Sequence, residues 1–323
     1  MNSITAYDSL VLNLPGNTCT RCPNSSFASF GAAADYGNNA VYIASYASAV
    51  TRIDTQTGAL TNIPISHPAY GIACVPQTNR CYVSASDGGN DYLEVINTLD
   101  NTAQEYQLST DSSSPTGVVA SPYAAGSKIF VGTNGGRVYC IDAGTIGYEL
   151  VELGSGAVNG LAVHPSGTWV YATFAPGGSV NGSVKRINAA ACSVVETETI
   201  SKPTGGTWTR PYGIALNHTY PSTDLTGYVT DYANNIIRLL TVTPTSLSLQ
   251  SQYHYPPASG GSQPTGIAVS PDDKYMVVCL QGGGTGNGEV DEIDLPRWQA
   301  LQEVPTNRPP ICLGNFITPY PAM

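Results

Sequence analysis

The amino-acid sequence predicts an all-β chain folded as a six-bladed β-propeller with four-stranded antiparallel blades. Three observations support this prediction. A glycine-centred motif recurs six times, each copy is followed by further β-rich segments, and turn residues are abundant while charged residues make up only 11% of the 323 positions. A strand-rich repeat of roughly 40–50 residues is the sequence signature of a propeller blade.

The motif is clearest at 263–271, which reads Gln-Pro-Thr-Gly-Ile-Ala-Val-Ser-Pro. The glycines at its centre follow one another at steps of 40, 46, 43, 53 and 53 residues. They are Gly31, Gly71, Gly117, Gly160, Gly213 and Gly266. Small residues in this first strand suit the crowded wall of a central channel, where glycine allows neighbouring backbones to approach closely.

Further strands follow each glycine in order. The second strands are expected at 42–43, 81–83, 129–131, 169–171, 227–229 and 275–278. The third strands are expected at 50–54, 93–97, 137–142, 184–188, 236–240 and 289–294. A looser fourth strand closes each unit. The alternating segment 10–14 is expected to supply the outer strand of the last blade, which would remove its exposed edge.

The whole chain 1–323 is therefore expected to be one propeller domain. Within it, 1–26 would hold the closing strand and a cysteine-containing loop, 27–297 the blades and 298–323 an irregular tail. The formal charge of −10 argues against nucleic acid and anionic membrane surfaces as partners. The sequence contains no run of about 18 apolar residues, so it predicts no transmembrane helix.

Eight cysteines and few lysines favour a secreted chain. The candidate disulfide pairs are Cys74–Cys81, Cys140–Cys192, Cys279–Cys312 and Cys19–Cys22. Free buried thiols are the alternative. Glycosylation sequons begin at Asn24, Asn181 and Asn217, as in a secreted glycoprotein. The start lacks a charged and apolar leader, so we expect the mature form of a chain of the secretory pathway.

The loops that enter the inner strands and those between the second and third strands should open on one face, around the channel mouth. That face is the default ligand site of the fold. His67 is expected to act there as acid or base, and Arg210 to polarise a carbonyl or anchor an enol, with Tyr212 as the third catalytic residue. The substrate-binding candidates are Tyr46, Tyr70, Asn159, Phe174, Trp208, Asp231, Tyr232 and Gln281.

These side chains are mostly aromatic or amide-bearing, so the expected partner is a small apolar or aromatic molecule, with neither a metal nor another cofactor. The alternative is that the rings cover blade ends and that Arg210 forms a salt bridge on its loop. No Gly-x-Ser-x-Gly or His-Glu-x-x-His motif is present, and the four histidines lack metal-ligand spacing. His164 and His218 follow inner strands and are expected on the opposite face.

The repeat resembles two related propeller groups. Residues 264–275 resemble the YVTN type, and residues 158–167 with 228–231 resemble the SMP-30/gluconolactonase type. The second resemblance implies a lactonase with a divalent cation held by a Glu, an Asn and an Asp. Asn159 matches the Asn, whereas Phe30 stands where the Glu-containing motif would be and Tyr212 replaces the Asp.

In its composition, cysteine use, aromatic mouth and missing hydrolase ligands, the chain also resembles the fungal hetero-Diels–Alderases of tropolone-sesquiterpenoid biosynthesis. That resemblance implies dehydration of a hydroxymethyl tropolone to a quinone methide, followed by cycloaddition to a humulene-type alkene. The sequence therefore favours a metal-independent cyclase of natural-product biosynthesis. The alternatives are a gluconolactonase-like hydrolase and a secreted propeller that binds a glycan or a protein.

Overall fold

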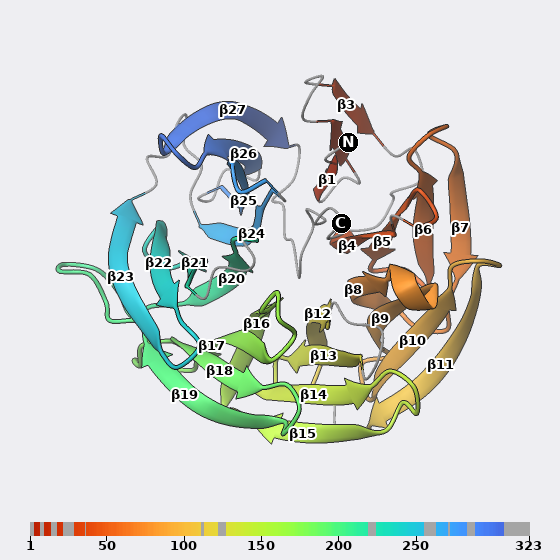
Figure 1. Cartoon of the computed structure of the whole chain (residues 1–323), viewed down its shortest axis with the longest axis horizontal. Coiled ribbons are helices and arrows are strands. Elements are labelled where there is room, and N and C mark those ends of the chain that lie inside the picture. The colour runs from red at the N-terminus through yellow and green to blue at the C-terminus, as the bar shows by residue number, and fades with distance from the viewer. Residues whose placement is uncertain are drawn as a thin grey trace.

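The chain folds into a ring of six four-stranded antiparallel sheets (Figure 1). The computed structural model describes residues 3–6, 10–13, 18–21, 29–35, 37–110, 113–121, 127–218, 224–254, 263–270, 272–282 and 288–306. Within these ranges the helical content is one short 3-10 segment, η2 at Pro76–Thr78, and no helix has the length and apolar character needed to span a bilayer. The predicted six-bladed β-propeller is confirmed.

Each blade is a meander whose first strand lies nearest the centre of the ring in Figure 1. The first three blades comprise β4 (Ser29–Asp35), β5 (Ala40–Ser45), β6 (Ala49–Asp54) and β7 (Leu60–Pro64); β8 (Ala69–Val75), β9 (Arg80–Ser86), β10 (Asp91–Asn97) and β11 (Thr102–Ser109); and β12 (Pro115–Ala120), β13 (Lys128–Thr133), β14 (Arg137–Asp142) and β15 (Tyr148–Glu152). The last three comprise β16 (Gly156–Val163), β17 (Trp169–Pro176), β18 (Ser183–Asn188) and β19 (Ser193–Thr199); β20 (Pro211–Leu216), β21 (Leu225–Asp231), β22 (Ile236–Val242) and β23 (Leu247–His254); and β24 (Pro264–Val269), β25 (Tyr275–Leu280), β26 (Gly288–Asp294) and β27 (Gln299–Thr306).

The closure of the last blade differs from the prediction. Its outer strand is β27, which follows β26 along the chain and pairs with it. The N-terminal segment expected in that place forms a separate three-stranded sheet of β1 (Ser3–Ala6), β2 (Leu10–Asn13) and β3 (Thr18–Arg21). Figure 1 shows this sheet between the sixth and the first blade. Strands joined by short connections pair with each other, and this local pairing leaves β2 with partners on both sides.

Every inner strand carries a β-bulge at its motif glycine. In five blades two residues, the glycine and the one before it, oppose a single residue of the second strand, and in β4 one residue before the glycine is unmatched. A Cβ at Gly213 would lie 2.4 Å from the Thr265 carbonyl oxygen of the next blade. The glycine is required there because no other residue leaves room for the neighbouring backbone.

A hydroxyl group fastens the bulge of one blade to the next blade. Thr230 of β21 accepts a hydrogen bond from the Gly213 amide at 2.7 Å and donates one to the Thr265 carbonyl at 2.6 Å. Thr173 repeats this arrangement one blade earlier, and Ser84 repeats it between the second and third blades. These contacts satisfy polar backbone groups that the bulge removes from the ladder, so they hold successive inner strands in a fixed relation.

Apolar layers fill the spaces between successive blades. Each of five core clusters combines residues of two neighbouring blades, from the first pair of blades to the fifth and sixth. A large aromatic ring occupies the same second-strand position in five blades. These rings belong to Tyr42, Tyr82, Phe130, Tyr171 and Tyr228. Each of these rings buries a large apolar surface, which stabilises the packing of neighbouring blades.

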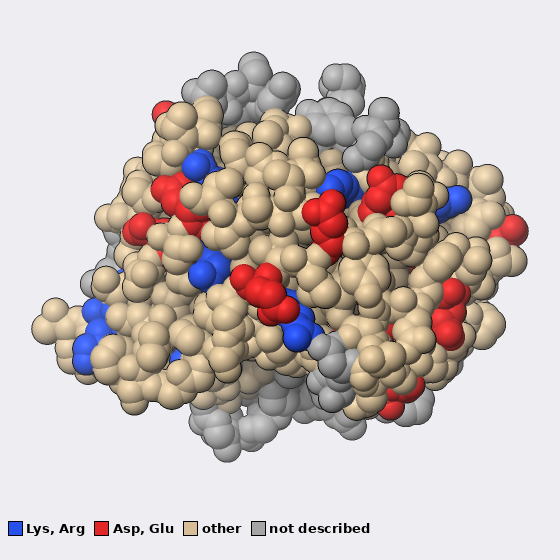
Figure 2. Space-filling view, turned by 90° about the horizontal axis from the view of Figure 1, so that it is seen from below, with Lys and Arg blue, Asp and Glu red and all other residues tan. Residues whose placement is uncertain are grey.

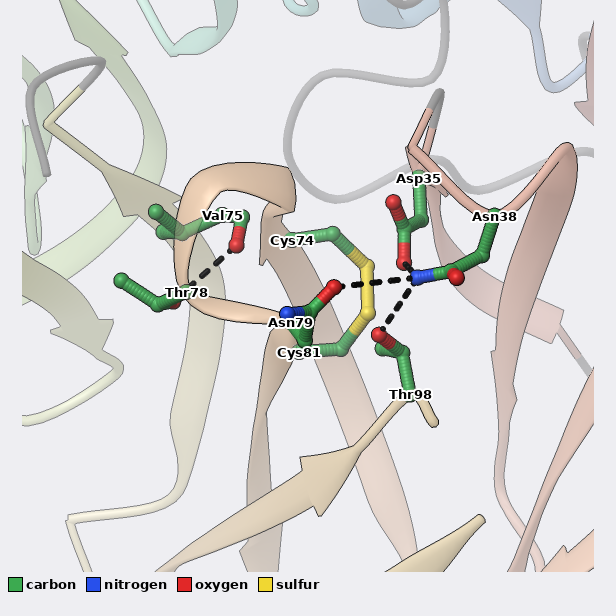
Figure 3. The surroundings of a disulfide bond; sticks show 8 residues. All are labelled: Asp35, Asn38, Cys74, Val75, Thr78, Asn79, Cys81 and Thr98. Carbon is green, nitrogen blue, oxygen red and sulfur yellow. Dashed lines mark hydrogen bonds between the residues drawn. A yellow bond between two sulfur atoms is a disulfide. The ribbon is translucent and has the colours of Figure 1, made fainter. Parts of the chain in front are cut away.

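The predicted Cys74–Cys81 disulfide is present and joins directly opposite residues of β8 and β9 (Figure 3). Cys140 and Cys192 are buried and not bonded to each other, so the predicted Cys140–Cys192 disulfide is not formed in this structure. The other two candidate pairs each include a cysteine outside the described residues, Cys22 or Cys312. The sequon at Asn24 also lies outside them.

A polar contact between the first two blades lies beside this disulfide (Figure 3). The Asn38 amide nitrogen donates to the Asp35 carboxylate at 2.7 Å within the first blade. It also approaches the Thr98 hydroxyl at 2.9 Å and the Asn79 side-chain oxygen at 3.4 Å in the second blade. Asp35 is fully buried, so these contacts stabilise the turn that faces the disulfide hairpin.

Charged side chains of both signs lie interspersed over the side of the ring seen in Figure 2. Cross-strand ion pairs join charged residues of opposite sign within blades. Arg137 lies 2.9 Å from Glu152, and Arg186 lies 3.0 Å from Glu196. On this side the acidic excess of the sequence is therefore not gathered into one patch.

Candidate ligand-binding face

The loops predicted to share a face do so, and backbone hydrogen bonds join them. The amide of Asn134, between the second and third strands, donates to Ser114, which precedes an inner strand, at 2.9 Å. The same contact joins Tyr232 to Arg210 at 3.0 Å and Gln281 to Gln263 at 3.2 Å. We call the side formed by these two kinds of loop the entry face.

Six residues, one from each blade, occupy the bulge position just before the motif glycine, where the inner strands begin at the entry face. They are Phe30, Tyr70, Thr116, Asn159, Tyr212 and Thr265. The two threonines are buried, whereas the four larger side chains keep part of their surface exposed. Bulges re-aim side chains at functional sites, so this ring of positions is the structural basis of the candidate site.

An aromatic group lies where the first two blades meet on the entry face. Phe30 and Tyr70 come from adjacent bulges, and Tyr46 comes from the loop between β5 and β6. The ring centroids are separated by 6.0 Å for Phe30–Tyr46, 5.7 Å for Phe30–Tyr70 and 5.5 Å for Tyr46–Tyr70. Tyr46 stands edge-on to both partners and is 47% exposed. We call these three residues the aromatic triad.

Tyr70 is the polar centre of the triad. Burial, followed by the hydrogen bond to Tyr46 and the nearby Asp91 carboxylate, raises the pKa of Tyr70 to about 12. Asp91 itself is fully buried at the start of β10, and burial raises its pKa. Its carboxylate accepts hydrogen bonds from the Ser113 hydroxyl and, at 3.4 Å, from the Tyr139 hydroxyl. The Tyr70 hydroxyl therefore keeps its proton at neutral pH.

A second aromatic pair belongs to the fifth blade. The rings of Tyr212, in the bulge of β20, and Tyr232, in the loop after β21, are tilted by 32° with centroids 6.1 Å apart. The Tyr232 hydroxyl donates to the Gln281 side-chain oxygen at 3.2 Å, which links the fifth blade to the sixth. The inner strands β20 and β24 lie across the centre of Figure 1 from β4 and β8. The predicted residues thus form two aromatic groups rather than one.

Arg210 is held by the backbone of the neighbouring blade. Its guanidinium donates to the carbonyl of Pro176 at 2.5 Å and to that of Gly178 at 2.7 Å. Its own amide donates to the Asp231 carboxylate at 3.0 Å. Asp231 is fully buried and lies 3.3 Å from the equally buried Arg238 guanidinium. Arg210 therefore ties its loop to the neighbouring blade. Asp231 joins the Arg210 backbone to Arg238, because a buried carboxylate needs a cationic or hydrogen-bonding partner.

His67 lies over the outer strands of the second blade instead of beside the inner strands. Its ring stacks on Tyr92 with centroids 3.9 Å apart, and its Nε2 lies 3.1 Å from the Glu105 carboxylate. Tyr92 and Glu105 belong to the third and fourth strands. Glu94, beside them, is buried and accepts a hydrogen bond from the Ser66 amide at 2.9 Å, and burial raises its pKa.

Three other predicted residues have defined neighbours. The Asn159 amide donates to the Pro211 carbonyl of the next inner strand at 3.0 Å. Phe174 is buried, with the Lys185 ammonium 5.4 Å from its ring centroid. Trp208 is 39% exposed and carries the Lys202 ammonium 4.6 Å above its ring. Trp208 thus adds an exposed ring to the entry face, apart from the triad.

The cation implied by the gluconolactonase resemblance does not fit these residues. Phe30, Asn159 and Tyr212, which stand at its three ligand positions, all occupy the bulge position, but two of them are aromatic. The Asn159 amide nitrogen is turned to the Pro211 carbonyl. Across the described ranges, no three His, Cys, Asp or Glu side chains gather as metal ligands would. A hard divalent cation requires several oxygen ligands.

Two residues of this site were not among the predicted ones. Phe30 completes the aromatic triad, and its place before the weakest copy of the motif glycine is the sequence signal that identifies it. Asp91 raises the pKa of Tyr70 from the start of a third strand. No local pattern marks Asp91, because its effect depends on the packing of two blades.

Fold and site together define a six-bladed β-propeller with an aromatic entry face. No protein-family model matches the sequence, and no curated protein matches it. Among solved structures, 1534 chains match. A chain of hydrazine synthase from Kuenenia stuttgartiensis is similar, with a TM-score of 0.66 over 89% of each chain at 16% sequence identity. A likeness at this identity shows a shared fold alone.

Proposed function

We propose that the entry face binds a small, planar and largely apolar molecule, and that the aromatic triad is the centre of this site. The observation that carries the proposal is the exposed Tyr46 ring, 47% accessible and edge-on to two further rings. Aromatic rings add about 0.5–1.5 kcal/mol per pair beyond the area that they bury. A planar ligand that covers Tyr46 gains the energy of apolar burial and that of the aromatic pair. The Tyr70 hydroxyl orients the polar edge of the ligand.

Tropolone is a suitable probe because it is planar and carries a hydroxyl and a carbonyl on adjacent carbons. Saturation-transfer NMR and calorimetry are expected to give a dissociation constant on the order of 0.1–1 mM, as for other small ligands. Cycloheptanone, which has the same ring size but is not planar, is expected to bind more weakly. Equal binding of the two compounds would contradict recognition by ring stacking.

Two variants separate the triad from the rest of the face. Tyr46→Ala is expected to weaken tropolone binding about tenfold, the loss of one aromatic contact. Trp208→Ala removes an exposed ring of the same face outside the triad and is expected to leave the affinity unchanged. The opposite outcome, in which only Trp208→Ala weakens binding, would place the site elsewhere.

A second candidate function is the cyclase expected from the sequence, and Tyr70 is the observation that favours it. A hetero-Diels–Alder reaction needs two partners in a near-attack pose and a donor to the oxygen on which charge develops. The pKa of Tyr70, at about 12, keeps the hydroxyl of this triad residue protonated. Arg210 and His67, by contrast, are engaged with loop carbonyls and with Glu105.

The cyclase is tested by incubation with a hydroxymethyl tropolone and a humulene-type alkene, with chromatography and mass spectrometry as the readout. Tyr70→Phe is expected to lower product formation by about 10²-fold, the loss of one preorganised donor, and to weaken tropolone binding by no more than about tenfold, the loss of one hydrogen bond. His67→Gln is expected to retain activity. Tropolone binding without any cycloadduct from the wild-type protein would leave the binding function and refute the cyclase.

A further inference from the structure

Two thiols lie together between the third and fourth blades, away from the entry-face loops. Cys140 belongs to β14, and Cys192 belongs to the turn between β18 and β19. Their exposed fractions are 2% and 7%, and both belong to the same apolar cluster. Burial, followed by the neighbouring Cys192 thiol, raises the pKa of the Cys140 thiol.

The backbone at Cys192 has a conformation that other turns of the ring assign to different residues. Its φ is +48°, and the corresponding positions of the first, second, third and sixth blades are Gly58 at +74°, Asn101 at +59°, Ile146 at +58° and Trp298 at +52°. Glycine and asparagine tolerate this region better than cysteine does. The Asn188 side chain accepts hydrogen bonds from Ala190 and Ala191 and so holds the turn in place. The turn thereby fixes the thiol at the boundary with the third blade.

A lysine completes the cluster. The Lys128 ammonium, at the start of β13, donates to the Cys192 sulfur at 3.1 Å and to the Ala190 carbonyl at 3.1 Å. Lys128 is only partly buried, so it connects the thiol pair with solvent. The thiolate is the nucleophilic form of cysteine, and Cys192 is both the less buried sulfur and the one in contact with the Lys128 ammonium. Of the two sulfurs, Cys192 is the one placed to react first.

We propose that Cys140 and Cys192 form a reversible disulfide that joins the third and fourth blades, with a low-molecular-weight disulfide such as glutathione disulfide as oxidant. The Cys192 thiolate attacks one glutathione sulfur, the glutathione S–S bond breaks, and one glutathione thiolate leaves with the Cys192 proton. The Cys140 thiolate then attacks the Cys192 sulfur, and the second glutathione leaves with the Cys140 proton. Two protein thiols are oxidised and one glutathione disulfide is reduced to two thiols.

Peptide mapping of the full chain tests the proposal. The protein is incubated with glutathione disulfide or with dithiothreitol, remaining thiols are alkylated, and trypsin then separates the two cysteines into peptides 138–185 and 187–238. We expect these peptides to be linked after oxidation and separately alkylated after reduction. The link between peptides 53–80 and 81–128, which carry Cys74 and Cys81, is the internal positive control. Alkylation or glutathionylation of both target peptides without a link would overturn the proposal.

Two variants assign the roles within the pair. Cys140→Ser is expected to stop the reaction at the mixed disulfide of Cys192 and glutathione. Lys128→Gln, with both cysteines retained, is expected to slow disulfide formation by glutathione disulfide about tenfold. The cause is the loss of one charge-assisted hydrogen bond. An unchanged rate would refute the role of Lys128.

Oxidation of the wild type should also raise the melting temperature by roughly 5 °C, because the bond closes a loop of 52 residues in the unfolded chain. Cys140→Ser should show no such rise under the same oxidant. An equal rise in the two proteins would show that the stabilisation comes from elsewhere.

Discussion

Gly213→Ala perturbs the contact between two blades directly, because it adds one methyl group where they touch. The new Cβ would lie 2.4 Å from the Thr265 carbonyl oxygen and 3.0 Å from the Ile267 amide nitrogen, whereas ordinary contacts begin at 3.4 Å. The two inner strands must therefore separate by about 1 Å at this point. That movement also stretches the hydrogen bonds of Thr230 to Gly213 and Thr265, now 2.7 and 2.6 Å.

The expected cost combines overpacking, at about 1–3 kcal/mol, with about 1 kcal/mol for each weakened hydrogen bond. The lower entropy of the unfolded alanine chain offsets about 0.4–1 kcal/mol of this cost. We therefore expect Gly213→Ala to destabilise the fold by about 2–4 kcal/mol, a melting temperature lower by roughly 3–6 °C. Calorimetry and urea unfolding measure the change.

Gly177→Ala is the matched control for this experiment. Gly177 is exposed in the loop after β17, and a Cβ built on it meets nothing within 4 Å. Its melting temperature should stay within about 2 °C of the wild type, as for other surface substitutions. Equal stability of Gly213→Ala and Gly177→Ala would show that the blades do not approach as described.

Three further predictions concern single side chains. Thr230→Val should lower the free energy of unfolding by about 2–3 kcal/mol, since it leaves the Gly213 amide and Thr265 carbonyl without their hydroxyl partner, and Thr230→Ser should restore most of it in urea titrations. Arg210→Ala should lower stability by about 1–3 kcal/mol without changing tropolone affinity, and a loss of affinity at unchanged stability would return Arg210 to the site. Burial raises the pKa of Glu94, so ionisation of Glu94 destabilises the fold as pH rises through that pKa. Glu94→Gln should therefore stabilise the protein at about pH 8 but have little effect near pH 4. Thermal unfolding of the variant and the wild type at the two pH values tests this prediction.

The fold could be predicted because its cause is local and repeated. Each motif glycine marks a bulge where the inner strands of neighbouring blades meet, so six copies of the motif predict six blades. The shared face of the entry loops followed from the same repeat. The closing strand could not be predicted in this way. The alternating pattern of 10–13 identifies a strand but not its partner, and β27, which is rich in polar residues and contains Pro305, gives only a weak strand signal.

The shared face of the candidate residues could be predicted from the sequence, whereas their individual contacts could not. The sequence placed Tyr46 and Tyr70 on one face because loop order fixes the face. It did not fix the distance of a residue from the ring centre, so it did not show that His67 would stack on Tyr92 over outer strands. The role of Arg210 as a tie to the Pro176 carbonyl likewise arises from a neighbouring blade. Contacts between blades depend on tertiary packing, which no local pattern encodes.

The most direct test of the binding site is a crystal structure of the protein soaked with tropolone. We predict density for the ring against Tyr46, with centroids 4.5–7 Å apart as in other aromatic pairs, and with its oxygen atoms directed to the Tyr70 hydroxyl. Tropolone bound at Tyr212 and Tyr232 alone, or absent from the entry face at saturating concentration, would contradict the assignment of the aromatic triad as the ligand site.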